Sequence, residues 1–160
     1  MTHPLDSLLK PRAIAVIGAS PDTRKLNGEL LNFLIEGGYA GRIIPVNPSY
    51  ADIRGLPCYP QVGAAGGDID LALVAIPASS VPKALEQCAA AGVRNAVVVS
   101  SGFAEEGGAS ASLQARLKDI ARSTELRISG PNCEGFYNAN DRVSATFSPT
   151  VPRSWKRPPP

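Results

Sequence analysis

The sequence predicts an α/β fold of the Rossmann-like, doubly wound type, in which a mostly parallel sheet carries helices on both faces. Short apolar runs rich in branched residues alternate along the chain with stretches whose apolar residues recur at helical spacing. The segments between successive runs are long enough for the crossovers that parallel pairing requires. Ligands of such sheets bind beyond the carboxyl ends of the strands, and a site is therefore expected there.

The first predicted strand, residues 13–17, is the element around which the other motifs are organised. Its branched apolar residues suit a strand covered on both faces. Gly18 stops the run, and a helical stripe follows that consists of Leu26, Leu30, Leu31, Leu34 and Ile35. A helix that opens just past a buried strand directs N–H groups and partial positive charge outward, so this turn is a predicted phosphate site. Gly37 and Gly38 are expected to end the helix.

The second predicted strand spans residues 42–48. Pro45 has no N–H to donate, which places this strand at an edge or makes it irregular. Residues 49–68 carry a weak signal, with a short strand expected near 56–59. Residues 70–77 form a run that is apolar after Asp70, and this run predicts a buried strand.

The helix after that strand is expected to be capped by Ser79 or Ser80 and to end at Gly92. Pro82 suits its first turn, and its inner face is predicted to carry Val81, Leu85 and Cys88. A valine-rich strand over 95–100 and a glycine-rich loop over 102–108 follow. A further helix is predicted next, with Leu113, Leu117 and Ile120 on its inner face. The last predicted strand covers residues 125–129, and residues 130–133 terminate it.

The length, net charge and cysteine content of the chain exclude several classes of protein. The 160 residues fit one domain, predicted over 1–148, followed by a Pro- and Arg-rich segment over 149–160 that is typical of a flexible linker or a truncation. A net charge of +2 and the lack of a long apolar run argue against nucleic-acid and membrane partners. Three widely spaced cysteines predict reduced thiols, a cytoplasmic protein and no metal site. With His3 as the one histidine, no catalytic residue is expected.

Two nucleotide-binding motifs are incomplete. The first turn lacks the G-x-G-x-x-G spacing, and the second strand ends in Asn47 and Pro48, where a plain NAD site would place an acidic residue. The spacing of an ATP-binding P-loop is also absent. An NAD(P)-binding oxidoreductase domain stays an alternative, although it would need a proton-transfer residue that the sequence does not offer.

Five blocks of sequence together resemble the CoA-binding domain of NDP-forming acyl-CoA synthetases. This family includes the ADP-forming acetate–CoA ligases and the alpha subunit of succinyl-CoA ligase. The blocks are residues 13–20, 44–48, 70–78, 101–105 and 130–135. The resemblance covers about residues 7 to 148, in the order and spacing of the family.

The resemblance implies a coenzyme A site along the carboxyl edge of the sheet. The phosphate-bearing, adenosine end would lie against the first turn, with a nearby lysine adding charge, at Gly18, Ala19, Ser20, Pro21 and Lys25. Asn47 and Pro48 would form the wall beside the nucleotide. The ligand would then cross the strand ends, and the pantetheine arm and thiol would follow, at Pro77, Ala78, Ser79, Ser101, Gly102, Phe103, Pro131, Asn132 and Cys133. Glu134 departs from the family, which more often has an apolar or small residue there.

The function that the resemblance implies is binding of CoA or acyl-CoA as one part of an acid–thiol ligase. In the family, the phosphorylated histidine and the ATP-grasp portion belong to other domains or subunits, which would be the partners of this chain. The alternative within the family is a stand-alone CoA-binding regulatory module. On either interpretation the chain is expected to bind CoA without catalysing a reaction by itself.

Overall fold

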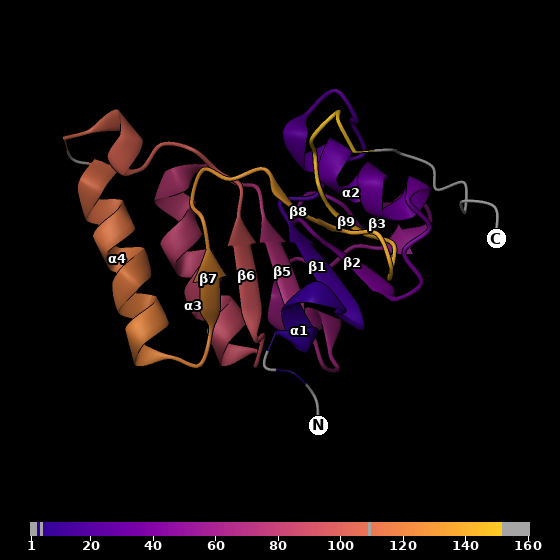
Figure 1. Cartoon of the computed structure of the whole chain (residues 1–160), viewed down its shortest axis with the longest axis horizontal. Coiled ribbons are helices and arrows are strands. Elements are labelled where there is room, and N and C mark those ends of the chain that lie inside the picture. The colour runs from indigo at the N-terminus through magenta and orange to yellow at the C-terminus, as the bar shows by residue number, and fades with distance from the viewer. Residues whose placement is uncertain (1–2, 4, 109, 152–160) are drawn as a thin grey trace.

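A five-stranded parallel sheet forms the centre of the molecule (Figure 1). The computed structural model describes residues 3, 5–108 and 110–151. The strands lie in the order β2-β1-β5-β6-β7, which confirms the predicted fold. They are β1 (Ala13–Ile17), β2 (Arg42–Val46), β5 (Leu71–Val74), β6 (Asn95–Val98) and β7 (Arg127–Ser129). Because β2 and β5 pair with opposite sides of β1, the switch point lies beside β1, as predicted.

Different elements cover the two faces of the sheet. The helices α3 (Val81–Ala90) and α4 (Ser110–Ser123) pack on one face. The helix α2 (Leu26–Glu36) and the hairpin of β8 (Gly135–Asn138) and β9 (Val143–Thr146) pack on the other. Alternate residues of each strand enter the two cores: in β1, Ala15 belongs to the first and Val16 to the second.

The expected helix ends after α2 and α3 are confirmed. Gly38 and Gly92 both have positive φ, +68° and +75°. At the end of α3, Val93 N donates to Cys88 O at 3.0 Å and Gly92 N to Ala89 O at 3.0 Å. This pair of bonds defines a Schellman ending, which requires a left-handed residue.

The beginning of α3 differs from the expectation. A 3₁₀ turn, η2 (Ala78–Ser80), precedes the helix, and Ser80 occupies the N-cap position without a capping hydrogen bond from its side chain. The backbone of the 3₁₀ turn satisfies the first N–H of the helix instead, because Val81 N donates to Ala78 O. Pro82 lies in the first turn of α3, as predicted.

The position of β2 at the edge of the sheet explains why the strand tolerates Pro45. Strand β2 is the outermost strand on its side, and beyond it only a single parallel bridge joins Val46 to Tyr59. Two short strands that follow β2, β3 (Asp52–Ile53) and β4 (Leu56–Pro57), form an antiparallel pair. The expected strand near 56–59 is therefore present in part, as β4.

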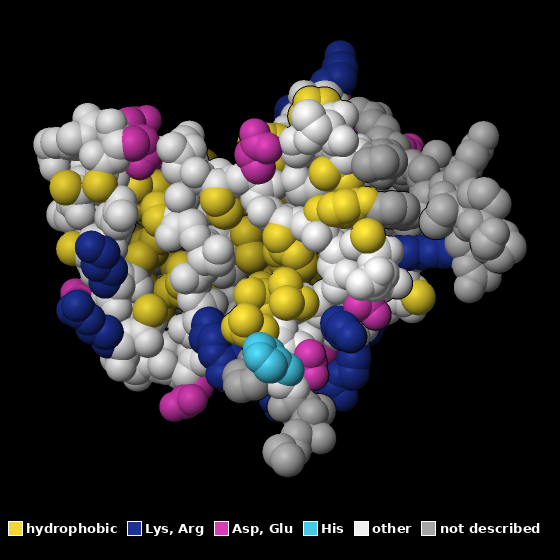
Figure 2. Space-filling view, viewed as in Figure 1, with side chains coloured by type: hydrophobic (Ala, Val, Ile, Leu, Met, Phe, Trp, Pro, Cys, Tyr) yellow, Lys and Arg dark blue, Asp and Glu magenta, His cyan; other side chains and the backbone are white. Residues whose placement is uncertain are grey.

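The hairpin β8–β9 was not predicted. It packs its inner side against α2 through Val143 and Ala145, which are buried. A short helix, α1 (Asp6–Leu9), lies on the same side, and its N-cap residue Leu5 and last residue Leu9 are each 40% exposed. Figure 2 shows apolar side chains gathered in the middle of this view of the molecule. Within the described ranges no helix has the length and apolar character to cross a membrane.

Two sequence expectations need qualification. Leu26 was placed in the inward stripe of α2, but it is 41% exposed because it stands at the first position of the helix, beyond the covered part of the sheet. The segment 149–160 falls outside the described residues from position 152 onward. The boundary at residue 148 therefore stays a prediction.

Candidate functional site

The turn after β1 is held in place by two asparagine side chains. Asn27 Nδ2, on α2, donates to the carbonyl oxygen of Gly18 at 2.6 Å. Asn47 Nδ2, just past β2, donates to the carbonyl oxygen of Ala19 at 2.9 Å. These bonds occupy both carbonyl groups and fix the turn to its two neighbours.

Gly18 is required by the backbone of the turn. Its φ is +90°, and a Cβ at this position would lie 2.5 Å from Ile76 Cγ2 and 2.6 Å from the Ala75 carbonyl oxygen. Any larger residue would therefore disturb the end of β5, whether or not a ligand touches Gly18. A substitution of Gly18 would therefore lower ligand affinity by distorting the end of β5, even without a direct contact between Gly18 and the ligand.

The helix α2 does not open directly on this turn, which corrects the sequence interpretation. It begins at Leu26, eight positions after Gly18, following an extended N-cap at Lys25. The intervening loop packs on the helix: a Cβ on Gly28 would lie 2.1 Å from the Asp22 carbonyl oxygen. Glycine at position 28 is thus what lets the loop approach α2 so closely.

Ser100 connects the carboxyl ends of the next strands. Its Oγ accepts a hydrogen bond from Ile76 N at 3.1 Å and donates to Ile76 O at 2.7 Å. Its carbonyl oxygen accepts from Asn132 N at 2.9 Å. The ends of β5, β6 and β7 are thereby joined, and the strand ends form one rim running from Asn47 to Asn132.

Two hollows lie side by side along this rim. The first, of about 380 Å³, is at the ends of β1, β2 and β5 and is bounded by α3. Its lining comprises Ile17, Gly18, Val46, Asn47, Pro48, Pro60, Gln61, Val62, Ile76, Pro77, Ser80, Lys83, Ala84 and Gln87. The second, of about 310 Å³, is at the ends of β5 and β6 and is lined by Leu26, Ala75, Ile76, Pro77, Val99, Ser100 and Ser101. We call them the first and second rim hollows; Ile76 and Pro77 belong to both.

The structure brings five of the predicted site residues into these hollows. Gly18, Asn47, Pro48 and Pro77 line the first rim hollow, and Pro77 and Ser101 line the second. They come from the ends of four different strands, as the convergence of loops in the sequence predicted.

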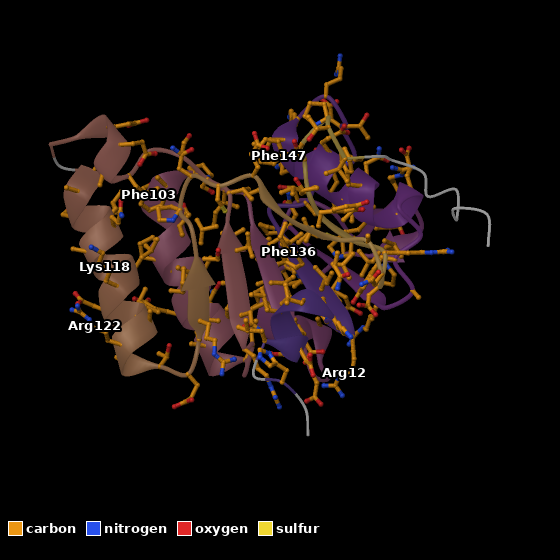
Figure 3. The ribbon with its side chains drawn as sticks, in the orientation of Figure 1. Arg12, Phe103, Lys118, Arg122, Phe136 and Phe147 are labelled. Atoms are coloured by element: carbon orange, nitrogen blue, oxygen red, sulfur yellow. The ribbon has the colours of Figure 1, made fainter. Side chains whose placement is uncertain are left out.

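Other predicted site residues lie elsewhere. Ala19, Ser20 and Phe103 are absent from the lining of both hollows, and their side chains are buried, with exposures of 0%, 5% and 0%. Phe103 belongs to the core beneath α3 and α4, near the start of α4 in Figure 3. The loop around it contacts η2, since a Cβ on Gly102 would lie 3.2 Å from Ala78 Cβ.

The remaining predicted residues are at the margins of the rim. Pro21, Lys25 and Ser79 are exposed and line neither hollow. Pro131 lines a separate small hollow of about 100 Å³ between α4 and β7. Cys133 is partly exposed, and its Sγ lies 3.4 Å from the Val98 carbonyl oxygen. Glu134, the departure from the family, is exposed.

Sequence reasoning missed the contribution of helix α3. Ser80, Lys83, Ala84 and Gln87 recur at positions i, i+3, i+4 and i+7 and so share the face that bounds the first rim hollow. That spacing was visible in the sequence. Polar residues on a helix usually mark a face in contact with solvent, however. The spacing alone does not distinguish such a face from one that bounds a ligand site.

Two carboxylates near the rim, Asp22 and Glu105, are held by hydrogen-bond donors of the protein. Arg24 Nε lies 2.9 Å from Asp22 Oδ1, and hydrogen bonds from Arg24 lower the pKa of Asp22 to about 2. The Gly102 N–H donates to Glu105 Oε1 at 2.8 Å. Hydrogen bonds from the backbone of Glu105, Phe103 and Gly102 keep the pKa of Glu105 below its usual value. No cluster suited to a metal ion occurs in the part of the chain that the structure describes.

Together, the parallel sheet with its switch beside β1 and the two hollows define a Rossmann-like α/β domain whose candidate ligand site lies at the carboxyl ends of the strands. Residues 12–139 match the family described as the CoA binding domain. The chain belongs to this family, which confirms the resemblance found in the sequence and coenzyme A as the cofactor.

Relatives with established names share most of this chain. The acetate–CoA ligase (ADP-forming) I of Archaeoglobus fulgidus is 39% identical over 148 residues, which is 92% of this chain and 21% of the relative. The alpha subunit of acetate–CoA ligase (ADP-forming) II of Pyrococcus furiosus is 37% identical over 143 residues, 89% of this chain and 31% of the relative. This chain thus spans about a fifth to a third of these relatives.

A solved structure has the same fold. The apo form of the dinucleotide forming acetyl-coenzyme A synthetase 1 of Ca. Korarchaeum cryptofilum superimposes with a TM-score of 0.86 at 39% identity. The match covers 91% of this chain and 31% of that one.

Proposed function

We propose that this chain is the CoA-binding portion of an NDP-forming acyl-CoA ligase, and that CoA lies along the rim with its nucleotide end in the first rim hollow. The observation that carries the proposal is the pair of adjoining hollows, which share Ile76 and Pro77 and so offer one path for a long ligand. The pantetheine arm would follow the second rim hollow toward the loop of Pro131, Asn132 and Cys133. A narrow groove lined by small and apolar residues suits this arm.

The chemical steps of the ligase would take place outside this chain. The named relatives are three to five times longer, because the chain spans 21% of one and 31% of another. We propose that a phosphohistidine domain and an ATP-grasp portion complete the reaction as partner domains or subunits. The three cysteines of the chain are free, which suits a reducing, cytoplasmic location.

The acyl group would be selected by other domains. Matching relatives are named for different acids: acetate, ferulate in a trans-feruloyl-CoA synthase, and 4-hydroxybutyrate in a ligase of Nitrosopumilus maritimus. The region shared with this chain is similar in all three, at 39%, 39% and 30% identity. A region that serves several acids fits recognition of their common co-substrate, CoA.

Titration calorimetry of the full chain with CoA, NAD and ATP tests the proposal. We expect CoA to bind and the other two nucleotides to bind far more weakly. No acidic residue stands at the end of β2 to receive the ribose hydroxyls of NAD, and the chain lacks the P-loop spacing that holds the phosphates of ATP. Binding of NAD without a response to CoA would favour the oxidoreductase alternative and reject the proposal.

A stand-alone CoA-binding module is the second candidate. It is favoured by a short solved chain, a conserved hypothetical protein from Pyrococcus furiosus, of which the match covers 94% at 25% identity and a TM-score of 0.58. Sequencing the reading frame past the codon of Pro160 separates the candidates. A continuation into a domain with a histidine supports the ligase, and an immediate stop codon supports the module.

A further inference from the structure

The first rim hollow contains one charged side chain among the described residues that line it, Lys83. No carboxylate is part of this lining. Lys83 is exposed, and within the described chain it forms no ion pair, whereas Arg24, Arg116 and Lys10 are each paired with an acid. An unpaired cation facing a hollow without acidic groups leaves a net positive site.

The backbone of α3 adds to this positive charge. Lys83 lies in the first turn of the helix, and Ser80, the N-cap residue, lines the same hollow. The amino end of a helix carries partial positive charge, which favours an anion there. The cation and the helix end therefore act on the same space.

The sequence pointed to a different lysine for this part of the ligand. Lys25 lies at the N-cap of α2 and lines neither rim hollow, and its neighbour Arg24 is held by Asp22. The structure thus offers Lys83, on the opposite wall from the β1 turn, as the cation within reach of a ligand in the first rim hollow.

We infer that Lys83 forms an ion pair with a phosphate of the nucleotide end of CoA. This inference rests on the proposed function and adds to it the residue that recognises the charge. CoA carries two kinds of phosphate at this end, the 3′-phosphate on the ribose and the diphosphate. An ammonium group pairs with either as a point charge.

The test compares Lys83→Met with the wild-type chain in calorimetric titrations with CoA, dephospho-CoA and pantetheine. We expect the Kd for CoA to rise about tenfold, the effect of losing one charge-assisted hydrogen bond. Pantetheine, which has no phosphate, should bind both proteins equally. Lys83→Arg keeps the charge and should retain most of the affinity. Equal melting temperatures would show that the fold is intact, as expected for an exposed side chain.

Matched lysine variants make the result specific. Lys10→Met removes the same charge from the opposite edge of the sheet, just before β1, where Lys10 forms an exposed 3.9 Å ion pair with Asp141, and should leave the Kd unchanged. A loss restricted to CoA would assign the ion pair to the 3′-phosphate, and an equal loss for dephospho-CoA would assign it to the diphosphate. Either result supports the inference.

Two results would overturn it. One is an unchanged Kd for CoA in Lys83→Met. The other is a loss seen in Lys25→Met and not in Lys83→Met. Failure of the wild-type chain to bind CoA would instead reject the proposed function itself.

Discussion

Arg12 holds the carboxylate of Asp70 at the edge of the sheet opposite the rim. Its Nε donates to Oδ2 at 3.1 Å, its Nη2 to Oδ1 at 3.2 Å, and its backbone N to Oδ2 at 2.8 Å. The Asp70 side chain is 5% exposed, whereas that of Arg12 is 70% exposed. Burial alone would raise the pKa of Asp70, but the hydrogen bonds and charge of Arg12 outweigh burial and lower it. The residues just before β1 and β5 are joined in this way.

We expect Asp70→Asn to lower the free energy of unfolding at pH 7 by about 1–3 kcal/mol, because the amide cannot accept all three bonds and leaves Arg12 with only the exposed Asp68 as a counter-charge. A depressed pKa stabilises the fold at pH values above the unfolded-state pKa of about 3.9, and this contribution is lost as the pH falls through the folded-state pKa. Urea unfolding at several pH values should therefore show a smaller acid-induced loss in Asp70→Asn. The control is Asp68→Asn, since Asp68 is 89% exposed and 3.8 Å from Arg12. An equal effect in both variants would contradict the prediction.

Gly28→Ala should destabilise the protein although the position is helical. In an ordinary helix this change stabilises by about 1 kcal/mol. Here the added Cβ would lie 2.1 Å from the Asp22 carbonyl oxygen, so the loop after β1 must move. We expect a lower melting temperature and weaker CoA binding. Gly63→Ala is the control because nothing lies within 4 Å of its Cβ. If Gly28→Ala raised the melting temperature, close packing of the loop on α2 would be disproved.

Asn47→Ala should weaken CoA binding about tenfold and cost about 1–2 kcal/mol of stability, because the side chain donates to Ala19 O and accepts from Ser49 N. Without its amide, the Ala19 carbonyl loses its donor and the turn after β1 loosens. Calorimetry and thermal unfolding measure the two effects. Asn140→Ala, in the exposed turn between β8 and β9, should change neither. An unaltered Kd in Asn47→Ala would mean that the turn does not shape the site.

The thiols should differ in reactivity. Burial raises the pKa of Cys88 to about 12 and also raises that of Cys58, while Cys133 is partly exposed at the rim. We expect an aromatic disulfide reagent to modify Cys133 first in the native protein, and acetyl-CoA, which has no free thiol to consume the reagent, to slow this reaction. The fast phase should disappear in Cys133→Ser. Rapid labelling of Cys88 or Cys58 would contradict their burial, and no protection by acetyl-CoA would contradict the placement of the thiol end.

The parallel sheet could be predicted because its central strands, β1, β5 and β6, are buried throughout and so appear as continuous, mostly apolar runs. The glycines after α2 and α3 mark helix ends in the same direct way. The hairpin β8–β9 could not be found so easily, because strands of four residues with mixed composition carry little periodic signal.

The candidate site was predictable where it is made of loops that follow strands, as at Gly18, Asn47 and Pro77. It was not predictable where tertiary packing decides which way a side chain faces. Phe103 follows a strand, as a lining residue would, yet it is fully buried in the core. Lys83 sits in a helix, and only the position of that helix against the rim brings the lysine to the hollow.

The turn of the hairpin is fastened to the beginning of the described chain. Asn138 Nδ2 donates to the Leu9 carbonyl oxygen at 2.9 Å, and Lys10 Nζ lies 3.9 Å from Asp141 Oδ2. From this turn β9 runs back toward the strand ends, where Thr146 pairs with Gly135 and its Oγ1 donates to the Glu134 carbonyl oxygen at 2.6 Å. Tension on the polypeptide after β9 would therefore reach the loop of Cys133 and Glu134 first, while the opposite end of the hairpin stays tethered beside α1.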